Sequence, residues 1–571
     1  MSKAPSPADA ARLEEAQALL RAGSTGRAVG ALRSLVAERP DLATAHHHLA
    51  LALELSGDTA GAESELRAAL RLDPLLGAAA AKLALRLIAQ GQAAQALEIV
   101  TPLAKSAAAD VNLLTAQGMA LKSLDRLDEA AVAYRRAAAA APGSGVAEHN
   151  LAALLGDAHR FAESQAATKR AFAKGLDAPE TWLVHARALT GLDQFDEAED
   201  AFREAIRRRS NYADAHRELA QLIWMRTESL EAARETLDAA LLKHGSDGPL
   251  SLVKAKLLET TGDLPGAYAA LAGPMQRWGS DSNLHLTAAN LIAGDDPQLA
   301  LAYAQKAFDA APGSGPATAA LCQANLALGR ADVAANLAAE LRQAWPLDQY
   351  AVALAATAWR LLGDPRYREL YDYDRFVQVR TIDTPAEWSS LPSFLKDLAA
   401  RLKSLQRLRG HPFDQSLRGG AQTGQSLALS EDPVIAAFFS AIDAPIRAYL
   451  RAIKGRDDVM GARVNEAGYR FAGAWSALLR PGGYHTDHLH PLGWISSACH
   501  IALPGAVDNG HEGWLKFGQP GIPTQPALSP EHFVKPKAGD LVLFPSYMWH
   551  GTVPFGGAEP RLALAFDVLP A

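Results

Sequence analysis

The feature that most limits the fold of this chain is a period of 34 residues in its first part. Small residues recur at that step, at Ala62, Ala96, Ala130, Ser164 and Ala198. Residues typical of turns recur at the same step, at Gly57, Gly91, Asp125, His159 and Asp193. Two sets of positions with one period indicate a repeated structural unit. A unit of this size cannot bury its own apolar face, so the units are expected to stack into a solenoid.

Within one period the spacing predicts two helices, and Pro179–Tyr212 shows this best. Each helix has apolar residues three and four apart on one face, namely Trp182, Ala186 and Leu189, then Ala198, Phe202 and Ala205. The pattern resembles the tetratricopeptide repeat over about residues 10–365. The resemblance implies an all-α solenoid with a groove that suits a protein or peptide partner.

The last third of the chain has a different texture, with more Gly, Pro and aromatic residues. Two helical patterns are followed by short apolar segments between turns, which we expect to be strands: "RFAGAWSALLRPGGY", "WISSACHIALP", "GWLKFGQPG", "GDLVLFP" and "RLALAFDVLP". Helices followed by many short strands predict an α+β domain built on an antiparallel jelly roll. We therefore predict two domains, a solenoid over residues 1–365 and a jelly-roll domain over residues 366–571.

Polar residues with metal-binding or anion-binding side chains lie at the ends of these strands. The stretch "HTDHLH" places three histidines and an aspartate within residues 485–490, His550 follows a later strand, and Arg561 begins the last one. In that last strand, alternation places Arg561 on the face that also carries Ala563, Ala565 and Asp567. The opposite face carries Leu562, Leu564, Phe566 and Val568. The small alanines leave room beside Arg561 for a small anion.

This order of residues resembles the 2-oxoglutarate- and Fe(II)-dependent oxygenases, and in particular a bacterial branch that is often fused to tetratricopeptide repeats. The resemblance covers about residues 405–571, including "HPFDQSLRGGAQTGQSL". It implies a double-stranded β-helix that binds Fe(II) through three protein ligands, with 2-oxoglutarate and O2 as co-substrates. It also implies that Arg561 holds the distal carboxylate of 2-oxoglutarate through two hydrogen bonds. No catalytic side chain beyond the metal ligands is identified.

The residues that bind the iron can be chosen in two ways. On a regular strand His485 and Asp487 share one face, and His488 and His490 share the other. With His550, the first pair gives the common set of two histidines and one carboxylate. The second pair gives three histidines, but it matches the His-x-His-Pro pattern of the bacterial branch. We predict His488, His490 and His550 as the ligands, with His485 and Asp487 as the alternative pair.

Composition limits the other functions that the chain could have. A net charge of −7 and a pI near 6.2 give no reason to expect nucleic acid or a membrane surface as a partner. The chain has two cysteines, no apolar segment at its N-terminus, and no evident apolar run long enough to span a bilayer, so we expect a cytoplasmic protein. The leading hypothesis is a dioxygenase that hydroxylates a protein or peptide selected by the solenoid. The alternative is a repeat scaffold with an inactive or cupin-like metal-binding barrel.

Overall fold

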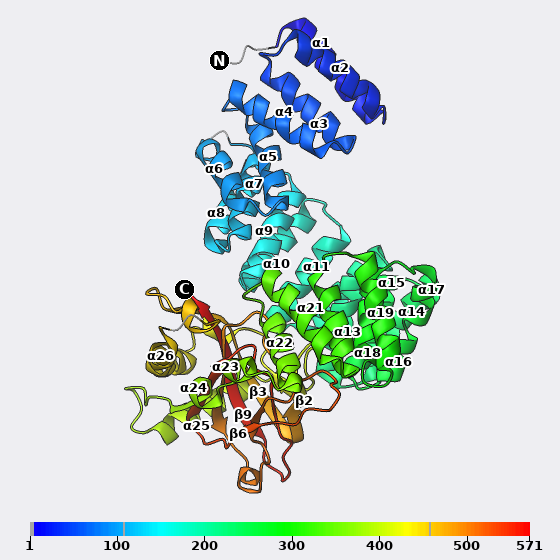
Figure 1. The fold of residues 1–571 in the computed structure, drawn as a ribbon. Coiled ribbons are helices and arrows are strands. Elements are labelled where there is room, and N and C mark those ends of the chain that lie inside the picture. Colours follow the sequence, from blue (N-terminus) through cyan, green and yellow to red (C-terminus); the bar gives the residue numbers. More distant parts are fainter. Residues whose placement is uncertain (1–4, 107–108, 456–457) are drawn as a thin grey trace. The chain divides into compact units, whose positions relative to one another are not determined.

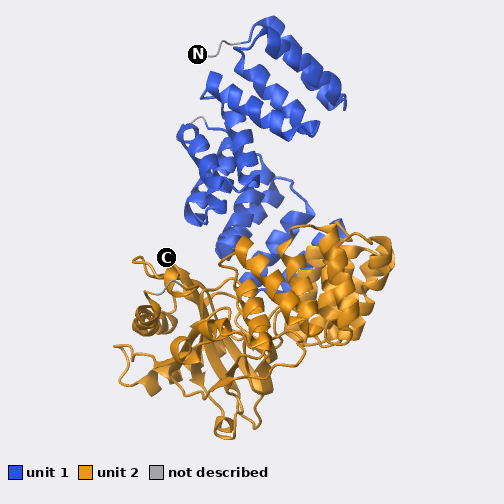
Figure 2. Ribbon diagram, in the orientation of Figure 1, with its two compact units in different colours: residues 1–208 blue, residues 209–571 orange. Residues whose placement is uncertain are grey.

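The computed structural model of the chain describes residues 5–106, 109–455 and 458–571 (Figure 1). The chain divides into two compact units, residues 1–208 and 209–571 (Figure 2). This division falls inside the repeat array, so the later repeats belong to the same compact unit as the strands. The domain boundary predicted between residues 365 and 366 stays a prediction.

Unit 1 consists of consecutive helices that pack side by side. They are α1 (Pro7–Arg21), α2 (Thr25–Glu38), α3 (Ala43–Leu55), α4 (Thr59–Leu72), α5 (Gly77–Ala89), α6 (Ala93–Ala104), α7 (Val111–Ser123), α8 (Leu127–Ala140), α9 (Gly145–Asp157), α10 (Phe161–Ala173), α11 (Pro179–Gly191) and α12 (Phe195–Arg208). Every small residue of the predicted set, from Ala62 to Ala198, is at most 1% exposed. These residues let the paired helices approach closely, which confirms the predicted solenoid.

The turns between these helices explain the second set of repeated positions. Each of its residues has a positive φ, from 56° to 86°: Gly57, Gly91, Asp125, His159 and Asp193. Glycine adopts this left-handed backbone at no steric cost, and aspartate and histidine tolerate it better than most residues. The residue type at these positions is therefore set by the backbone of the turn.

Unit 2 begins with further helices of the array. They are α13 (Ala213–Thr227), α14 (Leu230–His244), α15 (Gly248–Thr260), α16 (Leu264–Ala269), α17 (Ala272–Arg277), α18 (Ser282–Ile292), α19 (Pro297–Ala310), α20 (Gly315–Ala327), α21 (Ala331–Ala344) and α22 (Gln349–Leu362). Short helices follow, α23 (Arg366–Leu370) and α24 (Tyr373–Phe376), and then the longer α25 (Leu391–Ser404) and α26 (Pro433–Ile453).

The strands of unit 2 form two antiparallel sheets. The larger sheet has the order β1-β7-β4-β9-β3-β2 and the smaller one the order β6-β5-β8. The strands are β1 (Gln378–Thr381), β2 (Leu417–Gln422), β3 (Tyr469–His485), β4 (Ile495–Ala502), β5 (Leu515–Phe517), β6 (His532–Val534), β7 (Asp540–Pro545), β8 (His550–Thr552) and β9 (Arg561–Pro570). Short 3-10 helices lie at Leu427–Leu429, Gly461–Arg463 and Gly505–Asp508. The predicted jelly-roll domain is thus confirmed.

One face of the larger sheet is covered by helix α26. Leu562, Leu564, Phe566 and Val568 of β9 are fully buried on this side, as alternation predicts. Phe566 contacts Phe471 of β3, which in turn contacts Phe439 of α26, with ring centroids 5.5 and 4.9 Å apart. By length and composition α26 would suffice to cross a membrane, which corrects the expectation that no such apolar run exists. Its apolar residues, however, pack into the core of this domain.

Within unit 2 the repeats bind the segment that leads into β2. The main-chain N–H groups of Arg409 and Gly410 donate to the carbonyl oxygen of Met225 on α13, at 2.7 and 2.9 Å. Asp414 forms ion pairs with Arg217 of α13 and with Lys256 of α15. These contacts hold residues 409–414 on the repeat helices, and Ser416 follows two residues later.

Candidate functional site

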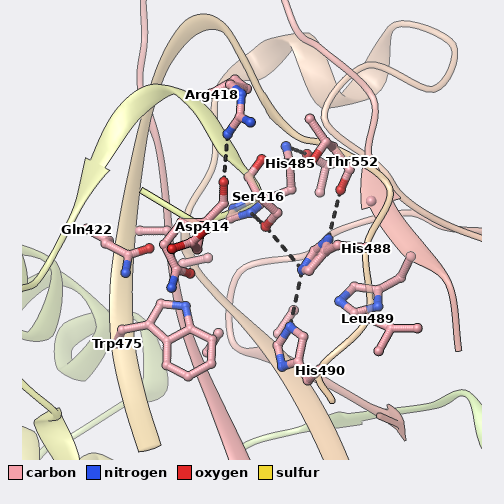
Figure 3. Close-up of a pocket in the computed structure, with 18 of the residues that line it drawn as sticks. Asp414, Ser416, Arg418, Gln422, Trp475, His485, His488, Leu489, His490 and Thr552 are labelled. Atoms are coloured by element: carbon pink, nitrogen blue, oxygen red, sulfur yellow. Dashed lines mark hydrogen bonds between the residues drawn. The ribbon is translucent and has the colours of Figure 1, made fainter. Parts of the chain in front are cut away.

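A cavity of about 560 Å³ lies in unit 2 between the β-sheets and helix α15 of the array. Strands β3 and β9 and the segment 485–492 line it from the sheet domain. The segment 414–418 and helix α15 line it from the other side. All the strand-end residues singled out in the sequence except Asp487 lie on its wall. Figure 3 shows His485, His488 and His490 with their neighbours in this cavity.

Three of the histidines form one cluster. In the part of the chain that the structure describes, His488, His490 and His550 form a group in which one ring nitrogen from each residue lies within 4.8 Å of the others. Two strand segments bring them together, because His488 and His550 exchange both main-chain hydrogen bonds, at 2.8 and 2.9 Å. His490 lies two residues further on, with its Nε2 atom 3.2 Å from that of His488.

The other ring nitrogen of each imidazole has an oxygen acceptor. Nδ1 of His488 donates to the carbonyl oxygen of Thr486 at 2.8 Å, and Nδ1 of His550 donates to that of Met548 at 2.9 Å. Nδ1 of His490 donates to the carboxylate of Asp567 at 2.6 and 2.8 Å. Because the acceptors are oxygens, each Nδ1 carries a proton and each Nε2 presents a lone pair to the cluster.

This arrangement fits a metal cation. The Nε2 atoms of His488 and His490 lie 3.2 Å apart, and their lone pairs face each other. A positive ion between the two atoms would remove the repulsion between these lone pairs. Two nitrogens bound about 2.1 Å from one metal lie roughly 3.0 to 3.4 Å apart. Burial, reinforced by His490, lowers the pKa of His488 to about 3, and burial lowers that of His550 well below its usual value. Imidazoles that stay neutral at physiological pH are the form that binds metals.

The two residues of the alternative pair, His485 and Asp487, do not lie in the same place: His485 lines the cavity and Asp487 does not. His485 is the last residue of β3 and lines the same cavity, where its Nδ1 lies 3.0 Å from the hydroxyl oxygen of Ser416. Asp487 is turned away and forms an ion pair with Lys516 of β5 at 2.8 Å. Burial raises the pKa of Asp487, and Lys516 opposes this rise. The strict alternation assumed for residues 485–490 ends at His485, because the residues after it leave the regular strand. The choice of ligands stays a prediction.

Arg561 is a buried cation without a carboxylate partner among the described residues. It is 2% exposed on β9, and burial lowers its pKa to about 10. Its Nη2 donates to Nδ1 of His500 at 3.3 Å, and its Nε has no hydrogen-bond partner. A buried guanidinium with an unused donor fits an anionic ligand. His500 is neutral here, since burial and Arg561 hold its pKa well below its usual value.

The sequence did not identify three other polar residues of this cavity. Asp567 was placed on the correct face of β9 by alternation, but its contact with His490 was not predicted. Ser416 lies between His485 and His488, with its hydroxyl oxygen 3.1 Å from Nε2 of His488. Arg418 lies above Ser416 in Figure 3. Only the motif "HPFDQSLRGG" signalled this segment, and nothing in it indicated which side chains reach the histidines.

Comparisons with known proteins agree with this geometry. The family model described as "Putative 2OG-Fe(II) oxygenase" matches residues 473–567, a range that contains the histidine cluster, Arg561 and Asp567. The tetratricopeptide repeat model matches residues 13–76 and 183–249. A search of curated proteins gives no match.

Solved structures resemble the chain in its repeats. Yeast Tom70 is 12% identical, covers 62% of this chain and 89% of its own, and has a TM-score of 0.36. A tetratricopeptide repeat protein from Parabacteroides merdae is 16% identical over 43% of this chain and 97% of its own, at 0.35. The structure titled "Human IFIT1 dimer with PPP-AAAA" is 16% identical, covers 53% of this chain and 72% of its own, and has a TM-score of 0.35. These likenesses support no conclusion about function. By the family models, the chain combines tetratricopeptide repeats with a C-terminal segment, residues 473–567, that matches the family described as "Putative 2OG-Fe(II) oxygenase".

Proposed function

We propose that this protein is an Fe(II)- and 2-oxoglutarate-dependent dioxygenase that hydroxylates a protein or peptide selected by its repeats. The observation that carries the proposal is the convergence of one ring nitrogen from each of three imidazoles, in the same cavity as a buried guanidinium that has no carboxylate partner among the described residues. The three imidazoles suit a metal ion, and the guanidinium of Arg561 suits a carboxylate. This enzyme class requires a site for the metal and a site for the carboxylate of 2-oxoglutarate. The family match at residues 473–567 supports the same class.

In this proposal each side chain has a defined task. His488, His490 and His550 hold the metal, and Asp567 orients the ring of His490 through its Nδ1 proton. Arg561 binds the distal carboxylate of 2-oxoglutarate. When bound, Fe(II) with 2-oxoglutarate and O2 supplies the oxidising power that hydroxylates a C–H bond. Phe544 and Leu515 line the cavity on the side of His550 and keep water from that wall.

The repeats supply part of the wall of the cavity, which favours a polypeptide substrate. Lys256, Glu259 and Thr260 at the end of α15 lie on its wall, opposite residues of β3 and β9. A substrate that fills this cavity therefore contacts a repeat helix, and tetratricopeptide solenoids suit extended peptides. We also propose a cytoplasmic location, which the acidic charge and the two free cysteines support.

The test is a spectroscopic one on the full chain. Anaerobic addition of Fe(II) and 2-oxoglutarate should give the weak visible charge-transfer band expected of this family, and later exposure to O2 should give succinate. Arg561→Ala should lose the band through weaker 2-oxoglutarate binding, whereas the exposed His511→Ala should keep it. His490→Ala should lose it as well, while His485→Ala should retain it. Retention in His490→Ala with loss in His485→Ala would assign the ligands to the alternative pair.

A second function is favoured by one observation, the absence of a carboxylate from the histidine cluster in the described residues. Three imidazoles also suit Zn(II) or the metal of a cupin-like protein, and a repeat scaffold could carry such a site without oxygenase activity. Metal binding by the wild-type chain with neither a charge-transfer band nor succinate would support this alternative and refute the dioxygenase.

A further inference from the structure

Among the charged side chains of the described residues that line the cavity, the carboxylates have partners of opposite charge and the guanidiniums do not. Each of its three carboxylates has a partner: Asp414 pairs with Lys256 and Arg217, Glu259 with Lys256, and Asp567 with His490. Its two guanidiniums differ from them. In the part of the chain that the structure describes, neither Arg418 nor Arg561 forms an ion pair with a carboxylate. The cavity therefore offers two cations that are free to bind anions.

Arg418 is fixed in place by its own main chain. Its Nη1 donates to the carbonyl oxygens of Gln415 and Leu417, at 2.6 and 2.8 Å. No hydrogen bond engages its Nε or Nη2 among the described residues, and these two donors form the fork that guanidinium groups use to bind carboxylate or phosphate. Burial lowers the pKa of Arg418, and Glu259 acts on it only at a distance, because the carboxylate of Glu259 engages Lys256.

The two arginines lie on different strands of the cavity wall, β2 and β9, and differ in burial. Arg561 is 2% exposed, beside His500 at the start of β9. Arg418 is only half-buried on β2, next to the segment that the repeat helices hold, and the repeat residues Lys256 and Glu259 line the same cavity. In Figure 3 Arg418 and His490 lie at opposite ends of the view, with Ser416 and His488 between them. A co-substrate bound at Arg561 would leave Arg418 available to a second ligand.

We propose that Arg418 is a substrate-binding residue, and that it binds an acidic group of a peptide substrate, either the carboxylate of an aspartate or glutamate or the phosphate of a phosphorylated residue. This inference rests on the proposed function, since it assigns Arg561 to 2-oxoglutarate. It predicts that the peptide carries its acidic group close to the residue that is modified, because Arg418 and the histidines share one cavity.

The experiment measures binding without turnover. The full chain is loaded with Zn(II) and 2-oxoglutarate, and saturation-transfer NMR is used to measure the Kd of capped pentapeptide pools whose central residue is Asp, phosphoserine, Asn or Ser. The wild-type chain should bind the Asp or phosphoserine pool about tenfold or more tightly than its neutral counterpart, as expected for charge-assisted hydrogen bonds. Comparison of the two acidic pools distinguishes carboxylate from phosphate.

Variants then assign the preference to Arg418. Arg418→Gln should reduce the preference for acidic pools to less than about twofold, and Arg418→Lys should keep part of it, since the charge remains but the fork is lost. The exposed Arg451→Gln is the matched control and should keep the full preference. Far-UV circular dichroism checks that each variant is folded.

Three outcomes would overturn the inference. They are no preference for acidic pools in the wild-type chain, an unchanged preference in Arg418→Gln, or a loss of 2-oxoglutarate affinity in Arg418→Gln comparable to that in Arg561→Ala. The last result would place Arg418 in the co-substrate site. Because peptide binding is measured without oxygen or iron, a failed oxygenase assay would refute the proposed function and leave the acidic preference measurable on its own.

Discussion

Asp567→Asn removes the only negative charge that contacts the histidine cluster in the described residues. The carboxylate of Asp567 accepts the Nδ1 proton of His490 at 2.6 and 2.8 Å and the hydroxyl proton of Ser496 at 2.7 Å. His488 and His550 donate instead to neutral main-chain carbonyl oxygens. His490 is therefore the imidazole of the cluster that is held by a charged acceptor, and loss of that charge should weaken metal binding.

The magnitude follows from what each substitution leaves behind. Loss of an outer partner of a metal-bound histidine weakens metal binding by about 10- to 100-fold, which corresponds to about 1.4 to 2.7 kcal/mol. Asp567→Asn keeps an oxygen acceptor near His490 and loses only the charge, so we expect about tenfold. Asp567→Ala leaves the buried Nδ1 proton without an acceptor, so we expect a loss closer to 100-fold.

The assay is a titration of the full chain with Co(II), followed by its visible d–d absorption at one fixed pH. Ser496→Ala is the control, because it removes one hydrogen bond to Asp567 and leaves the charge beside His490, and it should change the Co(II) affinity by less than about threefold. If both Asp567 variants bind Co(II) within twofold of the wild-type chain, the carboxylate does not support the metal site and the reasoning is wrong.

Three further predictions concern stability and are measured by urea unfolding of the metal-free chain. Burial lowers the pKa of Arg561 from 12.5 to about 10, so burying its charge destabilises the folded chain by about 3 kcal/mol. Arg561→Met should therefore raise the free energy of unfolding by about 1 to 3 kcal/mol. A decrease in that free energy would contradict this. Burial lowers the pKa of His411 from 6.5 to about 4, so unfolded His411 binds a proton in that window that the folded chain excludes. Stability should fall as the pH drops from 6.5 to 4, and His411→Phe should make this fall shallower by about 3 kcal/mol; an unchanged pH dependence would refute the assignment. Asp414→Ala should cost less than about 1 kcal/mol, because its ion pairs with Arg217 and Lys256 are half-exposed, and a loss above 2 kcal/mol would show that they are not screened.

The repeats and the faces of the strands could be predicted from the sequence because both depend on local periodicity. Ala62 and its equivalents occupy the same environment in each repeat, and Gly57 and its equivalents occupy the same left-handed turn. On β9 the alternation of side chains is fixed by the strand itself, so Arg561 and Asp567 were assigned to the cavity side correctly.

The pairing of short strands could not be predicted in this way. Strands β6 and β8 have three residues each, and β5, with which both pair, also has three. Segments of this length carry too little alternation to be recognised. The end of β3 affected the prediction of the site more than the short strands did. Because the regular strand stops at His485, the segment that follows brings His488 against His550 and turns Asp487 toward Lys516. His550, the residue that pairs with His488, lies 62 residues further along the sequence, beyond the reach of local patterns.

The least predictable part of the site is the wall that the repeats supply. Lys256 and Asp414 are 158 residues apart in the sequence, yet their ion pair holds the segment that carries Ser416 and Arg418. Ser416 contacts two histidines of the cavity, and Arg418 lies two residues beyond it. A change in the packing of α13 or α15 would therefore move groups that face the histidine cluster without altering any of the imidazoles. By this contact the repeats affect the shape of the cavity, and under the proposed function a substrate bound on the repeats would be in a position to influence the site directly.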